Sequence, residues 1–326
     1  MAYQTGTYSG INDALTEWKD FLLAQGWTIN DFSDDSSDYD AGPAFTGKRL
    51  HIQKTIGSTT HYFNFRSCSG QRVFDYSSYE PVTGICVNGS TGYNAGNTWD
   101  YQPGYTPYQY GESESGGGCV DKIVELGGDY FFSATATSAT AVFTTDSTNT
   151  DYRIMTIGDI EGRSIYSASG GYDANTNGTN NDYRSSYFGS PAYATNPFGL
   201  SGIKLSDGWY IGTLGLYGVD ARYLYPQVDV DNTGPIKDTL VGSTAAAILK
   251  YSPEHFKGNA PLVPCSPCIS KGVSDQLYPC GTLEGVYFLN MKNYSNETEI
   301  VIGANTYKLF KIFNPCSSGV AFLWMP

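Results

Sequence analysis

The segment near the N-terminus has the spacing of an amphipathic helix. Its apolar residues recur every three or four positions: Ile11, Leu15, Trp18, Phe21 and Leu22. Such a stripe covers one face of an α-helix, and Gly26 follows at a position where helices commonly end. We therefore expect a helix of about four turns that stops before Gly26 and packs its apolar face against a sheet or a partner.

Beyond this helix the pattern changes to that of β-strands. Residues 50–54 and 62–66 alternate between apolar and polar side chains around a Gly-Ser-Thr-Thr turn, which predicts a β-hairpin. Residues 85–87 predict a third strand, and short apolar runs separated by turns recur between 123 and 157. That spacing is typical of an antiparallel sandwich or meander. The acidic segment 31–40 predicts a solvated loop.

The C-terminal region predicts a second hairpin. Residues 299–302 and 306–310 are apolar, partly β-branched runs on either side of a Gly-Ala-Asn turn at 303–305. Gly and Asn tolerate the positive φ that tight hairpin turns demand. Because residues 321–324 are again apolar and aromatic, we expect the chain to end inside a sheet.

Together these patterns predict a mainly β protein with a short N-terminal helix (α+β), antiparallel sandwich-like sheets and long polar loops. We expect a helix plus β unit over 1–102, a β-rich middle unit over 119–250 and a C-terminal hairpin unit over 251–326. The middle and C-terminal units are alternatively one domain. The Pro- and Gly-rich segment 102–118 is the expected linker. The Gly/Asn/Ser/Tyr-rich segment 166–200 is expected to be a loop surface with a functional role.

Composition narrows the choice of partners. Hydrophobic residues make up 40% and aromatic residues 15% of the chain, which is enough for a folded core. The net charge of −13, with Lys48-Arg49 as the one adjacent basic pair, opposes direct binding to nucleic acid. We expect no membrane span, because no apolar stretch is long enough. Without a recognisable signal peptide, we expect synthesis and folding in a cytoplasm.

The seven cysteines leave two main alternatives open. They are Cys68, Cys86, Cys119, Cys265, Cys268, Cys280 and Cys316. The Cys-x-x-Cys spacing at 265–268 is that of a zinc knuckle, but a second pair with similar spacing is absent, so a zinc site is the weaker hypothesis. The cysteines are then either buried thiols that act as small hydrophobic groups or partners in at least one disulfide formed after assembly.

One polar turn has half of a calcium-binding pattern. Asp173, Asn175 and Asn177 place oxygen side chains at the first, third and fifth positions, and Gly178 follows for the sharp turn. The twelfth position should be a bidentate Glu and is Arg184. A plain polar turn is therefore favoured, with these three residues as weak metal candidates, and we expect no cofactor.

Catalytic patterns are absent from the sequence. It contains no G-x-S-x-G, P-loop or G-x-G-x-x-G motif, and its three histidines are isolated along the chain. We therefore expect that the protein is not an enzyme. Its tyrosines are the better functional signal, since tyrosine buries a large area at low entropic cost. Candidate interface residues are Tyr101, Tyr105, Tyr108, Tyr172, Tyr183 and Tyr187.

Three segments carry a family resemblance. The C-terminal hairpin with its closing aromatic strand, the opening Met-Ala-Tyr-Gln-Thr-Gly-Thr with Ala-Gln-Gly-Trp at 24–27, and the Gln-Pro-Gly stretch within 97–104 resemble a family of tailed-bacteriophage virion proteins. The resemblance covers both ends and one internal segment, and none of its motifs is catalytic.

The resemblance implies a non-enzymatic structural component of the virion, in the tail, baseplate or neck (collar). Such a protein is made in the host bacterial cytoplasm and assembles with other virion proteins and with itself as a homo-oligomer. One alternative is a receptor-binding or adhesion protein of the tail tip or fibre, in which 166–200 contact a host surface receptor. A second alternative is a glycan depolymerase, which would need two carboxyl groups in one cleft.

Overall fold

The computed structural model of this chain describes most of its N-terminal half and a smaller part of the remainder. The described residues are 2–37, 45–57, 59–71, 82–90, 92–99, 101–103, 118–121, 127–144, 152–161, 185–189, 199–201, 203–204, 210–211, 224–225, 262–264, 266–270, 277–279, 282–290, 293–311 and 318–325. Within them the protein is mainly β, with one short helix and antiparallel sheets, as the sequence predicts.

The predicted helix is confirmed as α1, Ile11–Ala24. Its apolar stripe is buried, and Gly26 follows with a φ of 79°, in the left-handed region where glycine is favoured. At its start, the Asp13 carboxylate accepts hydrogen bonds from the backbone N–H and the hydroxyl of Ser9, at 2.8 and 2.9 Å. An acid in the first turn also complements the positive end of the helix dipole.

The first sheet contains five strands in the order β2-β3-β4-β5-β6. Their bounds are Thr28–Asp35, Gly47–Ile56, Thr59–Gln71, Val82–Ser90 and Gly118–Asp121. The predicted hairpin is confirmed in β3 and β4, and the third strand in β5. The expectation of a loop over 31–40 was wrong for residues 31–35, which belong to β2, because the acidic side chains there have partners in the sheet.

The second sheet has the order β1-β7-β8-β9-β10-β11, and β18 also pairs with β9. Its strands are Ala2–Tyr8, Gly128–Ala134, Ser138–Thr144, Tyr152–Glu161, Ser185–Gly189, Gly199–Ser201 and Thr282–Leu283. β10 and most of β11 fall within 166–200, so the expectation of a continuous loop there was wrong in part. The sequence does not predict these two strands, because no alternating pattern can be recognised among the surrounding Gly, Ser and Tyr residues.

The third sheet has the order β15-β19-β22-β21-β20 and contains the predicted C-terminal hairpin. Its strands are Val263–Pro264, Val286–Asn290, Ser318–Met325, Asn305–Lys311 and Glu299–Ile302. Two small sheets are also present in the described part of the chain. One pairs β12 (Ile203–Lys204) with β13 (Tyr210–Ile211), and the other has the order β14 (Leu224–Tyr225), β16 (Ser266–Ser270) and β17 (Leu277–Pro279).

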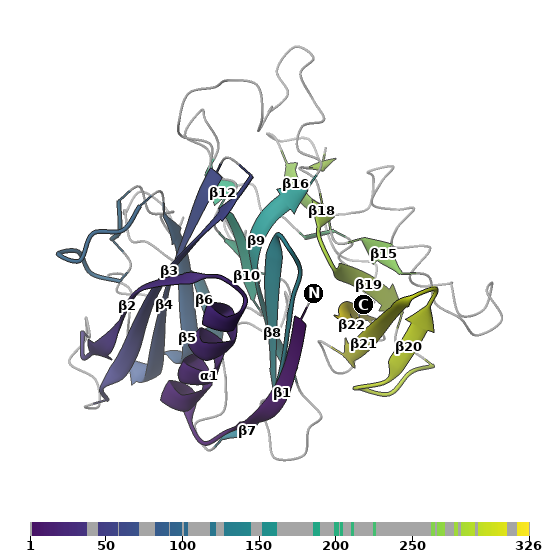
Figure 1. The fold of residues 1–326 in the computed structure, drawn as a ribbon, viewed down its shortest axis with the longest axis horizontal. Helices are drawn as coiled ribbons and strands as arrows, with labels where there is room; N and C mark the ends of the chain where they lie inside the picture. The colour runs from purple at the N-terminus through teal and green to yellow at the C-terminus, as the bar shows by residue number, and fades with distance from the viewer. Residues whose placement is uncertain are drawn as a thin grey trace, which may run out of the picture.

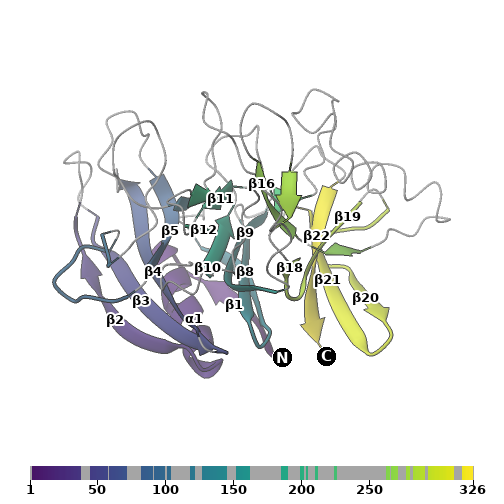
Figure 2. The ribbon, with the colours of Figure 1, turned by 90° about the horizontal axis from the view of Figure 1, so that it is seen from above.

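The three larger sheets lie side by side, with the second in the middle (Figures 1 and 2). β1 pairs along its whole length with β7, so the N-terminal strand is part of the middle sheet. β6, which follows the expected linker, pairs with β5 as the last strand of the first sheet. The strand pairing therefore crosses the limits of the three predicted units, whose division stays a prediction.

The main core lies between the first and second sheets, where α1 fills the space (Figure 1). The ring centroids of Trp18 and Phe21 lie 5.0 and 5.5 Å from that of Phe132 on β7. Ala139 and Ala141 of β8 belong to the same core, and their small side chains leave room for these rings. All seven residues of β8 are buried, so this strand is covered on both faces.

The opposite face of the middle sheet packs against the third sheet. The ring of Phe310 lies 5.1 Å from Phe131 and 5.3 Å from Tyr152. The Lys308 ammonium lies 5.0 Å from the centre of the Phe131 ring, and the Tyr152 hydroxyl donates to the Glu297 carboxylate at 2.8 Å. Aromatic and polar contacts thus join these two sheets.

Glu284 makes the most specific polar link at this junction. Its carboxylate accepts hydrogen bonds from the backbone N–H of Thr137 at 3.2 Å and from the Thr137 hydroxyl at 2.6 Å. The Ser138 hydroxyl donates to the Glu284 carbonyl at 2.8 Å. Burial raises the pKa of Glu284, but hydrogen bonds from Thr135 and Thr137 outweigh it, so the net pKa lies below its usual 4.5.

We expect Glu284→Gln to lower the free energy of unfolding at pH 7 by about 1–2 kcal/mol, because a charge-assisted bond becomes a neutral one. The folded pKa is depressed, so the carboxylate's contribution is full above pH 4.5 and is lost as the pH falls through the folded pKa. Urea unfolding of both proteins from pH 7 to pH 3 measures this. The half-exposed Glu299 supplies the control, and Glu299→Gln should have a smaller effect. A difference that stayed constant down to pH 3 would contradict the role of the charge.

Candidate functional site

The structure describes only some of the predicted site residues. The metal candidates Asp173, Asn175 and Asn177 lie outside the described residues, as do Tyr105, Tyr108, Tyr172, Tyr183, Cys265, Cys280 and Cys316. Tyr187, Cys119 and Cys268 are placed by backbone alone, on β10, β6 and β16. Tyr101 is half-buried, and its carbonyl accepts a hydrogen bond from Asn97 Nδ2 at 2.7 Å.

The strongest cluster of chemically active side chains is a layer on the first sheet, on the face turned away from α1. We call it the polar layer, and its six buried members are His51, Asn64, Arg66, Cys68, Cys86 and Ser90. Alternation along the strands explains it. On β4, Phe63 and Phe65 face the core, so Asn64 and Arg66 face the other way.

A chain of hydrogen bonds crosses three strands within the polar layer. His51 Nδ1 and Asn64 Oδ1 lie 2.7 Å apart, Asn64 Nδ2 donates to the Ser90 hydroxyl at 3.0 Å, and Ser90 donates to the Gly92 carbonyl at 2.9 Å. Because the amide nitrogen of Asn64 faces Ser90, its oxygen accepts from His51, which places the imidazole proton on Nδ1. Burial lowers the pKa of His51 below its usual 6.5, and the bond to Asn64 only partly opposes this. His51 is therefore a neutral, structural group at pH 7.

Acidic residues of β2 pair with the arginines of this face. Arg49 Nε donates to the Asp31 carboxylate at 2.8 Å and to the Ser33 hydroxyl at 2.9 Å. The fully buried Arg66 lies with its Nε 3.6 Å from an Asp35 carboxylate oxygen. A buried guanidinium is tolerated only when an acid lies beside it. The acidic residues of β2 are therefore needed as ionic partners for the arginines on the neighbouring strands of the same sheet.

The segment 92–103 adds ordered structure beside the polar layer. The Tyr93 ring lies 5.1 Å from the His51 imidazole. Gln102 is buried and organises the turn, since its Nε2 donates to the carbonyls of Asn94, Asn97 and Thr98 while its Oε1 accepts from the Asn94 N–H at 2.8 Å. The Gln of the Gln-Pro-Gly stretch therefore holds this turn together through its side-chain hydrogen bonds.

Two of the seven cysteines meet in the polar layer. Cys68 and Cys86 are buried thiols with their sulfurs 3.6 Å apart, and the Cys68 thiol donates to the Gly84 carbonyl at 3.4 Å. On the other side of β5, Cys86 is the register partner of Cys119. The hydrogen bond to Cys86 and burial raise the pKa of Cys68 well above its usual value. Cys68 therefore stays protonated and is a poor nucleophile.

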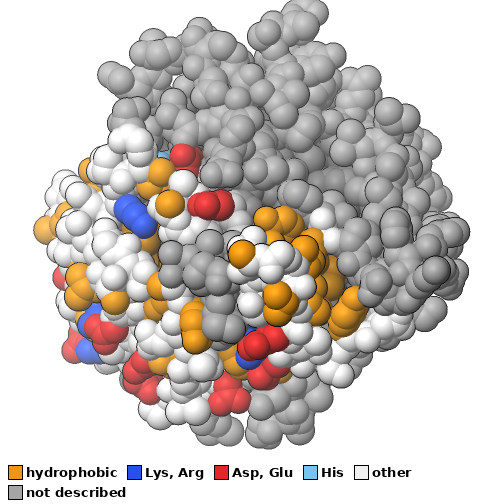
Figure 3. All heavy atoms as spheres, turned by 45° about the vertical axis from the view of Figure 1, so that its right-hand side comes forward, with side chains coloured by type: hydrophobic (Ala, Val, Ile, Leu, Met, Phe, Trp, Pro, Cys, Tyr) orange, Lys and Arg blue, Asp and Glu red, His pale blue; other side chains and the backbone are white. Residues whose placement is uncertain are grey.

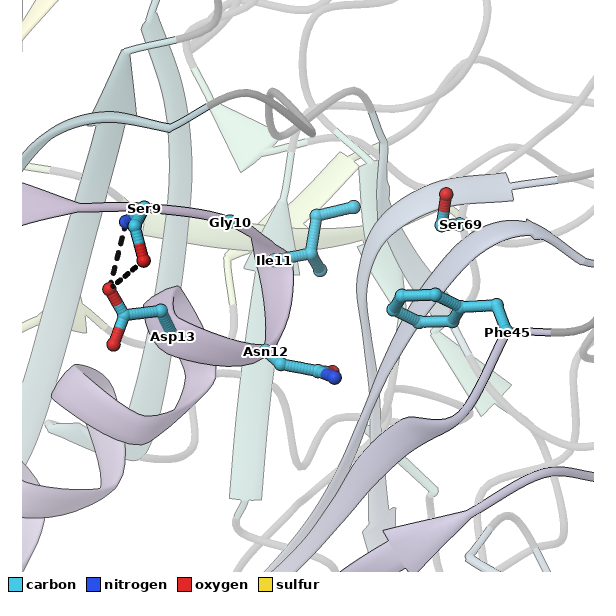
Figure 4. A pocket seen from close by; sticks show the side chains of 7 residues that line it. All are labelled: Ser9, Gly10, Ile11, Asn12, Asp13, Phe45 and Ser69. Carbon is cyan, nitrogen blue, oxygen red and sulfur yellow. Dashed lines mark hydrogen bonds between the residues drawn. The ribbon is translucent and has the colours of Figure 1, made fainter.

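A pocket of about 380 Å³ opens at the start of α1 (Figure 4). It is lined by Ser9, Gly10, Ile11, Asn12, Asp13, Phe45 and Ser69. Its polar side chains already have internal partners. Asn12 donates to the Thr46 carbonyl at 2.9 Å and accepts from the Ser67 hydroxyl at 2.5 Å, while Asp13 bonds Ser9. The Asn12 contacts anchor the start of the helix to the first sheet.

Exposed apolar side chains single out the edge strand β20. Val301 is 71% and Ile302 is 51% exposed, and both lie on this four-residue strand. Among the described residues, β20 pairs with β21 alone. Figure 3, which brings this side of the molecule forward, shows hydrophobic side chains gathered on it. An open edge with apolar side chains can accept a further strand.

Comparison of the chain with models of known protein families and with curated proteins yields no match in either case. Within the described ranges, no three His, Cys, Asp or Glu side chains lie close enough together to hold a metal ion. None of the helices in the described part of the chain has the length and apolar character needed to cross a bilayer.

The neutral state of His51 makes the protein sensitive to acid. Its folded pKa is lowered, so its stabilising contribution is full above pH 6.5 and is lost as the pH falls through the folded pKa. We expect His51→Gln, which keeps a donor for Asn64, to flatten the decline of the unfolding free energy between pH 7 and pH 5. Parallel pH titrations of urea unfolding measure this. Equal slopes for the two proteins would contradict it.

The buried thiols should resist alkylation in the folded protein. We expect iodoacetamide at pH 8 to modify Cys68 and Cys86 at least about 100-fold more slowly than an exposed thiol, because both are buried and the pKa of Cys68 is raised. A cysteine introduced as Tyr3→Cys, where the native side chain is half exposed, provides the matched reference. Peptide mass spectrometry after timed labelling, with and without urea, gives the rates. Fast labelling of either native thiol in the folded state would refute the prediction.

Proposed function

We propose that this protein is a non-enzymatic structural component of a tailed-phage virion, in the tail, baseplate or neck (collar). It assembles through contacts with copies of itself and with other virion proteins. The observation that supports this best is the open, apolar edge of β20. This edge belongs to the C-terminal hairpin, which is one of the segments that resemble phage virion proteins.

An open edge is informative because proteins that act alone usually protect their edges. Charged side chains, prolines, bulges or covering segments prevent strand-to-strand association. β20 instead exposes Val301 and Ile302, and its one charged residue, Glu299, pairs with Lys308 at 3.6 Å on the neighbouring strand. Such an edge suits a subunit whose partner is supplied during assembly.

The chemistry of the polar layer supports a structural role as well. His51 is neutral and bonded to an amide, and Cys68 stays protonated, so neither is activated as a base or a nucleophile. The layer crosses β3, β4 and β5 and links them through buried hydrogen bonds. The part of the layer that runs from His51 through Asn64 and Ser90 is a hydrogen-bonded network, and such networks rigidify a sheet.

Immunogold labelling of purified particles tests the proposal. We expect the protein to co-sediment with particles in a density gradient. An antibody raised against the purified protein should label the tail, baseplate or neck, whereas preimmune serum labels nothing. Absence from mature particles would refute the proposal. Label confined to the distal tip or fibres, together with loss of host adsorption on antibody addition, would replace it with a receptor-binding role. Release of sugars from host polysaccharide by the purified protein would replace it with a depolymerase.

A further inference from the structure

We infer that β20 pairs antiparallel with β20 of a second copy of this chain, so that the sheet β15-β19-β22-β21-β20 continues across a two-fold axis. The pairing presupposes self-association and therefore rests on that part of the proposed function. It does not depend on where in a particle the protein lies. Three features of the hairpin lead to it: the direction of its backbone groups, its register and its charge.

The backbone of β20 directs hydrogen-bonding groups away from β21, to a side where no other described strand pairs with it. The turn between β20 and β21 has two residues, and the register pairs Ile302 with Asn305 and Ile300 with Tyr307. In such a hairpin the pair beside the turn is hydrogen-bonded, and every second pair along the ladder repeats this. Thr298 continues the alternation, because its carbonyl accepts from the Leu309 N–H at 2.9 Å. The N–H and C=O groups of Glu299 and Val301 therefore point away from β21, toward the open edge.

The same alternation limits the registers open to a second copy. Ile300 packs on the small core of the third sheet, whereas Val301 points to the other face. A continuous sheet keeps faces aligned, so residues opposite each other must point the same way. Any two-fold axis centred on a residue meets this condition. We place it on Val301, because the most exposed apolar side chain of the strand then lies opposite its own copy, and Ile300 lies opposite the copy's Ile302.

Charge favours this surface over others on the chain. The protein carries a net charge of −13, which opposes contact between copies at most surfaces. Residues 299–311 contain one acidic and two basic residues, so this hairpin differs in sign from the whole. In the register centred on Val301, Glu299 lies opposite Gly303 of the copy and meets no like charge. The apolar run can therefore come together without placing like charges opposite each other.

A distortion limits the length of the contact. Glu297 has a φ of 61°, uncommon for a residue other than glycine, and its N–H donates to the same Leu309 carbonyl that faces Thr298 in the ladder. This bulge ends the regular strand before Glu299. The pairing then involves only the few residues from Glu299 to the turn, which predicts a reversible dimer and not a permanent one.

Sedimentation-velocity ultracentrifugation of the purified full chain tests the pairing. We expect a concentration-dependent monomer–dimer equilibrium in the wild type. Val301→Lys should weaken the dimer by at least about 10-fold, because two like charges would face each other across the axis. Val301→Glu should do the same. Leu23→Lys, at an exposed position on α1, is the matched control and should leave the equilibrium unchanged.

Mixing the two charge variants gives the sharpest result. A lysine and a glutamate at position 301 of different copies lie opposite each other only in the register centred on Val301, so the mixture should form dimers that neither variant forms alone. A wild type that stays monomeric at high concentration, or a Val301→Lys dimer as tight as the wild type, would overturn the pairing. Failure of the mixture to associate would overturn the register. Circular dichroism of each variant confirms folding, as expected for a side chain that is 71% exposed. Particle labelling together with a monomeric purified protein would leave the proposed function standing without this contact.

Discussion

The packing of α1 onto β7 is the interaction on which the rest of the fold depends. Trp18 and Phe21 reach Phe132, which in turn contacts Phe143 of β8 at 5.6 Å between ring centroids. The other face of the middle sheet packs against the third sheet, where Phe131 and Tyr152 contact Phe310, and β8 is buried throughout. The middle sheet is thus the shared layer of two cores, and a helix at one end of the chain supports a hairpin that lies near the other end.

The middle sheet is buried on both faces, so the first and third sheets each have an outer face that is not covered by it. On the first sheet, this outer face is stabilised by polar contacts. Arg66 has Asp35 beside it, His51 has Asn64, and the turn held by Gln102 lies next to them. On the third sheet the solution is incomplete, because β20 leaves apolar side chains in solvent. The outer face of the first sheet is therefore satisfied by internal polar contacts, while the third sheet has an edge strand that can associate with a further strand.

Much of the fold could be predicted from the sequence because local periodicity determined it. The stripe from Ile11 to Leu22, the β3–β4 hairpin and the turn at Gly303 all have signals confined to one element. β2 could not be predicted, since its Asp residues resemble a solvated loop until Arg49 and Arg66 are placed beside them. The polar layer was missed for the same reason, because its members meet only through strand pairing. Alternation opposite Phe63 and Phe65 on β4 was the one signal that pointed to it.

The outer edge strands of the first and third sheets, β2 and β20, differ in how well their side chains prevent pairing with a second chain. β2 carries Asp31, Asp34 and Asp35, which pair with Arg49, Lys48 and Arg66, so this edge presents charged groups, a common way to discourage pairing with a second strand. β20 carries one acid, which Lys308 on the next strand partly neutralises, followed by three apolar residues. An acidic chain of net charge −13 already repels its copies at long range. The apolar run on β20 relieves it at one place. A protein that needed only solubility would gain by placing a charge at Val301 as well, and its absence there is best explained by a contact that the strand itself makes.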